Sequence, residues 1–197
     1  MAIAGFSTSL ARAVPLAVLL ATGLAGISAF PAAAQEKAIV REKNPPGDIP
    51  DNQVFVTYNA PQGFSLKVPE GWARADAGDS VSFADKYGRI DVTVTTLHAP
   101  LTAASVRANE AAELEKAGRA VKISAISEVK LPAGPAVRIV YSSNSDRNPV
   151  TNKQIRVESE RFLIGHNDKV AALTFSAPAG ADNADQWTLM SKSFRWQ

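Results

Sequence analysis

The chain of 197 residues contains no cysteine and only two histidines, His98 and His166. Without cysteine it can form no disulfide bond and cannot carry the lipidated amino terminus of a lipoprotein, so its stability must come from packing alone. A zinc or copper site needs several converging histidine, cysteine or carboxylate ligands. Two isolated histidines do not meet that need, and we expect no bound metal.

An excess of charge of one sign is also lacking, since 21 lysines and arginines are balanced by 19 aspartates and glutamates. Proteins that bind nucleic acids concentrate basic charge on one face, so we expect no nucleic-acid partner. The sequence has no P-loop, no dinucleotide-binding glycine motif and no complete nucleophile elbow. We therefore expect no cofactor, no catalytic residue and no enzymatic activity.

Long apolar runs are confined to the start of the chain. The uncharged stretch Ala13–Ile27 follows Arg12 and precedes the small residues Ala32, Ala33 and Ala34. This pattern is typical of a Sec-type export signal, and we expect cleavage between Ala34 and Gln35. The run is shorter than the roughly 20 residues that cross a bilayer, although a retained membrane anchor is the alternative. The expected product is periplasmic or secreted, with no integral membrane segment after cleavage.

Its composition divides the chain into three regions. Residues 1–34 form the signal, and residues 35–52, with three prolines between positions 45 and 50, are expected to form an extended tether. The tether either acts as a spacer or packs along the domain edge. Residues 53–197 are long enough for one domain with its own core.

The stretch Lys153–Ala177 predicts a long antiparallel hairpin. Turn-forming residues, Gly165 to Asp168, separate two apolar-rich segments. On the return segment the side chains alternate with period two, which indicates a half-buried strand. The alternation places Ala171, Leu173 and Phe175 on one face and Ala172, Thr174 and Ser176 on the other.

The other elements predict an α+β fold, with helices packed on an antiparallel sheet. Further strands are expected over Val54–Asn59, Phe64–Val68, Val81–Ala84, Ile90–Leu97, Val121–Leu131, Ala136–Ser143 and Ser193–Trp196. A helix over Ala103–Ala117 begins after the N-cap Thr102 and carries an apolar stripe at Leu101, Ala104, Ala108, Ala111 and Leu114. A last helix, Ala184–Lys192, begins after Asp182 or Asn183.

Two segments resemble the PsbP-like family. Gly63–Trp72, preceded by Tyr58 and Asn59, is similar to the family's N-terminal signature of a glycine-phenylalanine pair, alternating hydrophobic positions, proline and tryptophan. Lys169–Pro178, with Trp187 and Ser193-Phe194, is similar to its C-terminal half. The resemblance implies an α/β/α sandwich with a central twisted sheet. The family includes the extrinsic subunit of photosystem II, a Ran-binding nuclear protein and bacterial envelope proteins such as DcrB, which implies an accessory or binding role.

Two clusters of polar residues could take part in catalysis or metal binding, but each has a better structural explanation. His166, Asn167 and Asp168 are explained by turn geometry before metal binding. Glu158 and Glu160 project from the same strand face, whereas paired catalytic carboxylates normally face each other across a cleft. A solvated or ion-paired face explains them better.

Three functions remain for comparison. The first is an exported accessory protein that binds a protein partner of unknown identity. Its expected contact residues are Trp72, Arg74, Lys86, Arg89, Asn144, Asp146 and Arg147. The second is a carrier of a small apolar ligand, held in a pocket between helix and sheet. The last is a hydrolase, which requires a cleft that joins His98 or His166 to carboxylates from distant strands.

Overall fold

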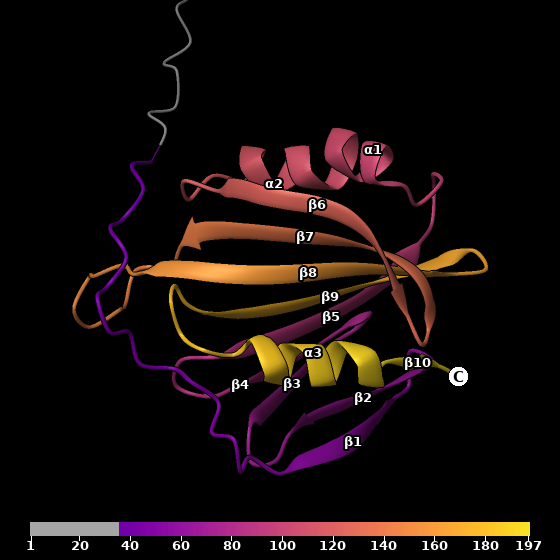
Figure 1. Ribbon diagram of the computed structural model, residues 1–197, viewed down its shortest axis with the longest axis horizontal. Coiled ribbons are helices and arrows are strands. Elements are labelled where there is room, and N and C mark those ends of the chain that lie inside the picture. The colour runs from indigo at the N-terminus through magenta and orange to yellow at the C-terminus, as the bar shows by residue number, and fades with distance from the viewer. Residues whose placement is uncertain (1–35) are drawn as a thin grey trace, which may run out of the picture. The chain divides into compact units, whose positions relative to one another are not determined.

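Residues 36–197 are described by a computed structural model (Figure 1). The elements in chain order are β1 (Phe55–Ala60), β2 (Phe64–Pro69), β3 (Ala73–Ala77), β4 (Ser80–Ala84), β5 (Arg89–Thr96), α1 (Ala103–Val106), η1 (Arg107–Ala111), α2 (Ala112–Lys116), β6 (Lys122–Leu131), β7 (Gly134–Asn144), β8 (Arg156–His166), β9 (Lys169–Pro178), α3 (Ala184–Ser193) and β10 (Arg195–Trp196). The predicted signal, residues 1–34, and its cleavage site between Ala34 and Gln35 lie outside the described residues.

The predicted hairpin, β8 and β9, occupies the middle of a seven-stranded antiparallel sheet with the order β3-β4-β5-β9-β8-β7-β6. Phe162 lies opposite Leu173 in this pair. Asn167, in the turn between the strands, has a φ of 53°, a left-handed conformation that asparagine tolerates. β1, β2 and β10 form a separate three-stranded sheet. The arrangement confirms the α+β class.

Period-two alternation gives the large sheet two different faces. Leu173 and Phe175 project from one face and join the main apolar core, which includes Met190 of α3. Leu163 projects from the other face into a second apolar cluster, which includes Val106 of α1. Figure 1 shows α1 and α2 running along β6, whereas α3 lies beside β2. The two helical regions therefore cover opposite faces, as the predicted sandwich requires.

Residues 36–52, the predicted tether, lie along the domain and are called the strap here (Figure 1). Two buried asparagine side chains, Asn144 and Asn183, hold its backbone, and each accepts one hydrogen bond from the strap and donates another. The strap groups are the Ile39 N–H and Lys37 carbonyl at Asn144, and the Ile49 N–H and Gly47 carbonyl at Asn183. Of the two alternatives for this segment, packing along the domain is observed.

One strand, β3, has no counterpart in the prediction. All five of its residues, Ala73–Ala77, are exposed, so the sequence shows no alternation of apolar and polar positions. The strand forms because it pairs with β4 at the edge of the large sheet, with Asp76 opposite Val81. Pairing with a neighbour is information that hydrophobic periodicity does not contain.

The predicted helix over Ala103–Ala117 is present, but its middle turn, η1, is a π-helix. Val106 and Ala111, five residues apart, are both buried because a π turn brings positions i and i+5 onto one face. The predicted stripe assumed regular α-helical spacing. It is wrong for Ala104 and Ala108, which are exposed.

Candidate functional site

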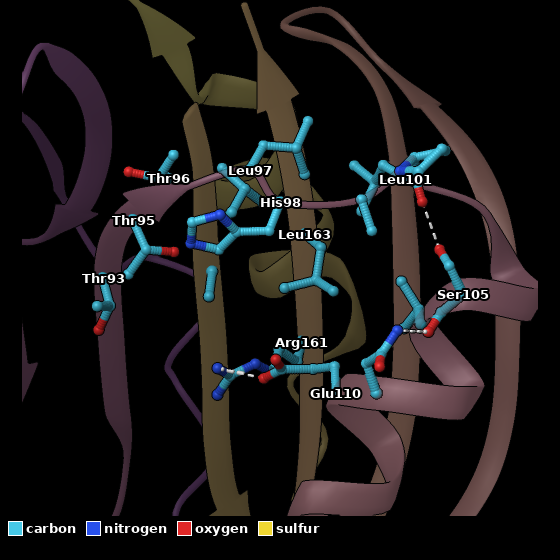
Figure 2. Close-up of a pocket in the computed structure, with 16 residues that line it drawn as sticks. Thr93, Thr95, Thr96, Leu97, His98, Leu101, Ser105, Glu110, Arg161 and Leu163 are labelled. Atoms are coloured by element: carbon cyan, nitrogen blue, oxygen red, sulfur yellow. Dashed lines mark hydrogen bonds and ion pairs between the residues drawn. The ribbon is translucent and has the colours of Figure 1, made fainter. Parts of the chain in front are cut away.

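A pocket of about 450 Å³ opens between the large sheet and the α1–η1 helix (Figure 2). Its floor is the helix-facing side of three neighbouring strands. Thr93 and Thr95 come from β5, Ala172 from β9, and Leu163 from β8. These positions share a face because residues two apart on a strand project in the same direction. The single helix is too narrow to cover all seven strands. The pocket lies at the edge of the helix, over strands that it leaves partly open.

The connection from β5 to α1, residues 97–101, forms one wall of the pocket. His98 and Leu101 line the pocket from this connection. Gly165 of β8 lies beside this connection, where a Cβ would make an ordinary van der Waals contact, 3.4 Å from Leu101 Cδ2. Thr102 then begins the helix, as predicted, in a capping box with Ser105.

The π turn contributes two polar residues, Asn109 and Glu110, to the pocket. π turns are rare inside helices and are frequent at functional sites. The Asn109 side-chain amide donates to the Ser105 carbonyl at 2.9 Å, so the side chain folds back along the helix. The interruption of the α-helix therefore coincides with the polar part of the pocket wall.

An ion pair lies on the floor at the β8 side. Arg161 Nη2 is 2.6 Å from Glu110 Oε1, and its Nη1 is 3.3 Å from Thr174 Oγ1. Arg161 Nε is buried and has no hydrogen-bond partner. Figure 2 shows this pair at one end of the pocket, away from His98 and the strand-end threonines. Apolar side chains, including Leu163, lie between the two polar ends.

The pocket holds His98 and one carboxylate, Glu110, which comes from η1 and not from the distant strands that the hydrolase hypothesis required. Among the hydroxyl groups that line the pocket, that of Ser105 is engaged by the helix cap. Its Oγ donates to the Pro100 carbonyl and accepts from the Thr102 N–H. These bonds give Ser105 a structural role at the start of α1.

Of the predicted contact residues, Arg74, Lys86 and Arg89 are exposed, and each has a neighbour of its own. Trp72 is half-buried against the main core, and it lies so close to Gly88 that a Cβ there would be 2.6 Å from its ring. Arg74 pairs with Asp76 at 3.1 Å, and Arg89 pairs with Asp91 at 2.8 Å. Lys86 lies over the Tyr87 ring. A partner contact through these residues stays a prediction.

The polar composition of Ser142–Asn152 predicts an exposed loop that carries Asn144, Asp146 and Arg147, but Asn144 belongs to β7 and is only 1% exposed. Its side chain binds the strap and also accepts from Arg156 Nη1 at 3.0 Å. Asp146, which pairs with Arg119, and Arg147 lie in the exposed part of the loop. Only these two of the three loop residues are available to a partner.

The remaining polar candidates have structural partners. Glu158 and Glu160 pair with Arg41 and Arg138, as expected for an ion-paired face. His166 stacks on Trp196, with ring centroids 5.7 Å apart.

Between residues 36 and 197, no three histidine or acidic side chains gather as a metal site. Within the same range, no helix combines the length and hydropathy needed to span a bilayer.

Arg161 and Glu110 are two charged pocket residues that the sequence did not mark as site candidates. A signal was present in β8, because Arg161 is on the same strand face as Leu163, at a position that faces the helix. A charged residue at such a position requires a partner or a ligand. Glu110 carried no equivalent signal, since regular helical spacing placed it off the apolar stripe.

Deletion of Ala108 is predicted to convert η1 into a regular α-helical turn with a change of less than about 1 kcal/mol in the free energy of unfolding. Val106 and Ala111 would then be four residues apart and would stay on one face. Deletion of Glu113 is the control, because it rotates Leu114 by about 100° and loses about 1–2 kcal/mol of its packing. Urea denaturation of both variants tests this, and equal losses would contradict it.

Comparisons with known proteins concern the fold. No protein-family model and no curated protein match the chain. The Ran-binding protein Mog1p of Saccharomyces cerevisiae matches 73% of the chain and 96% of its own length, with 11% identity and a TM-score of 0.51. The cyanobacterial PsbP of Synechocystis sp. PCC 6803 matches 77% and 98%, with 15% identity and a TM-score of 0.49.

A crystal structure from Bacteroides thetaiotaomicron VPI-5482 matches 72% of the chain, with 15% identity and a TM-score of 0.48, and the chain spans only 48% of that protein. At 11% identity the similarity to Mog1p shows the fold alone. It supports the predicted PsbP-like fold, because a Ran-binding nuclear protein is among the family members named above. The chain thus has a PsbP-like α+β fold, and its function must be argued from its own pocket.

Proposed function

We propose that the chain is an exported binding module that holds a small, mainly apolar molecule in the pocket between α1–η1 and the large sheet. The observation that carries this proposal is the pocket of about 450 Å³ itself. Ligand sites are concave, mostly apolar and fitted with a few converging polar groups. The sequence alone favoured a protein partner over a small ligand, whereas the pocket favours the small ligand.

The lining supports an apolar ligand with a polar end. Leu97, Leu101, Val170 and Ala172 all line the pocket and remain partly exposed, so a ligand would remove further apolar surface from water. Burial of such surface contributes about 25 cal/mol per Å². Hydroxyl and charged groups at the two ends would orient the molecule.

Export and the absence of catalysis belong to the same proposal. The apolar run and the small residues before Gln35 support a periplasmic or secreted location. The engagement of the Ser105 hydroxyl by the helix cap supports a role without nucleophilic chemistry. A carrier or an accessory protein needs neither a metal nor a redox group.

Binding of a protein partner is the second candidate. The observation that favours it is the exposed loop after β7, where Val150 is 89% exposed beside the accessible Asp146 and Arg147. Mog1p, whose fold is similar, is itself a Ran-binding protein. Loops on a rigid scaffold are common sites of recognition.

Replacement of Ala172 by phenylalanine tests the pocket. The full chain is expected to bind the neutral fluorescent probe N-phenylnaphthylamine, and Ala172→Phe is expected to weaken this binding by about tenfold or more, because the added ring occupies the pocket floor. Fluorescence titration measures both affinities.

The matched control is Ala75→Phe, at an exposed position of β3 outside the pocket. It should bind the probe as the unaltered chain does. Thermal unfolding of each variant shows whether it is folded. A folded Ala172→Phe variant with unaltered affinity, or an unaltered chain that does not bind the probe, would overturn the proposed function.

A further inference from the structure

Arg161 is incompletely satisfied in the pocket. Its side chain is 24% exposed, and only one oxygen of Glu110 and the Thr174 hydroxyl contact its guanidinium group. Nε is buried without a partner. Nε and Nη2 form one edge of the planar guanidinium, and this edge matches the two oxygens of a carboxylate. Glu110 occupies only half of it.

The ion pair is poorly explained by stability. An ion pair whose side chains are 24% and 33% exposed keeps part of its hydration and typically contributes little to stability. Leu163, two residues along on the same face, shows that apolar side chains pack well at this level of the sheet. The arginine beside it, with a buried unpaired N–H, is therefore better explained by binding than by packing.

Glu110 is a displaceable partner. It lies in the π turn, its side chain is 33% exposed, and it contacts Arg161 through a single oxygen. Release of Glu110 would return its carboxylate to water without moving a strand. A ligand that offers both oxygens would satisfy Nε as well as Nη2.

We infer that the pocket binds an amphiphile with a carboxylate head group. Its alkyl chain would lie against Leu163, Leu101 and Val170, and its carboxylate would take the Nε–Nη2 edge of Arg161 from Glu110. The inference rests on the proposed function and names the ligand class for the same pocket. It assigns Arg161 the anchoring role and Glu110 the role of a competing internal anion.

The test compares decanoate with decanol, which share an alkyl chain and differ in the head group. Both are titrated by calorimetry into the full chain at one ionic strength. Decanoate is expected to bind about tenfold tighter or more, since a hydrogen-bonded charged pair is made only by the acid. Arg161→Met should reduce decanoate binding to the level of decanol measured with the same variant.

Glu110→Gln gives the opposite sign, because removal of the competing carboxylate should tighten decanoate binding relative to decanol binding measured with the same variant. Arg161→Lys keeps the charge and loses the bidentate edge, so it should retain only part of the preference for decanoate. The control Arg138→Met breaks a comparable ion pair with Glu160 on the opposite face of the sheet and should not alter the preference.

The outcomes separate the two proposals. Equal binding of decanoate and decanol, unaffected by Arg161→Met and Glu110→Gln, would overturn the carboxylate inference and leave an apolar-ligand pocket in place. Failure of the folded, unaltered chain to bind decanoate, decanol or N-phenylnaphthylamine would overturn the inference together with the proposed function. A preference for decanoate that is lost in Arg161→Met and increased in Glu110→Gln supports it.

Discussion

Replacement of Asn183 by leucine is expected to lower the free energy of unfolding by about 2–4 kcal/mol, because one buried and one partly buried strap group lose their partner. Asn183 is 3% exposed, accepts from the Ile49 N–H at 2.6 Å and donates to the Gly47 carbonyl at 2.9 Å. Leucine has nearly the same volume and can replace neither bond. Urea denaturation measures the loss.

The control is Asn52→Leu, an exposed position at the end of the same strap, where a change within about 0.5 kcal/mol is expected. Hydrogen exchange adds a local measurement, since the Ile49 amide should exchange faster in Asn183→Leu. If Asn183→Leu unfolds at the same urea concentration as the unaltered chain, the strap does not contribute to stability as described.

Replacement of Phe175 by alanine should lower the free energy of unfolding by about 3–5 kcal/mol. Phe175 is fully buried in β9, stacks on Trp187 with centroids 5.9 Å apart, and meets Phe162 edge-on at 6.2 Å. Truncation would leave a cavity where the central strand meets α3. Thermal and urea unfolding would both report the loss.

Tyr87→Ala is the comparison, since it removes an aromatic ring that is 40% exposed. Its expected cost is below about 1 kcal/mol. Similar losses for the two variants would mean that β9 is not the centre of the apolar core.

Sequence periodicity predicted the middle of the sheet well. Ala171, Leu173 and Phe175 lie in the main core, and Ala172 and Thr174 face the helix, as the alternation required. Period-two patterns succeed where one face of a strand is more apolar than the other, because burial then selects a single register. The hairpin turn followed from residues that tolerate its backbone geometry.

The parts that were missed depend on contacts between distant segments. Asn183 occupies the N-cap position of α3, as predicted, yet its side chain makes no cap bond because it binds the strap 134 residues away. The strap itself is proline-rich, a composition that is equally consistent with a free spacer. β3 has no apolar alternation, and its assignment required knowledge of its pairing with β4.

The candidate site was predicted only in outline. A pocket between helix and sheet was one of the expected alternatives, and His98 was already a candidate residue. The π turn could not be predicted, because the sequence of Arg107–Ala111 is compatible with a regular helix. Without knowledge of the π turn there was no reason to place Glu110 beside Arg161. The polar end of the pocket therefore could not be predicted from the sequence.

The central claim is that the pocket under α1–η1 is the binding site, and methyl NMR of the full chain titrated with N-phenylnaphthylamine tests it most directly. Chemical-shift changes are expected at Leu101, Val106, Leu163 and Val170, which line the pocket. Val81 in the core and Val150 in the exposed loop should not respond. Changes confined to Val150 and the loop after β7, with the pocket methyls unaffected, would contradict the account and favour that loop as the binding surface.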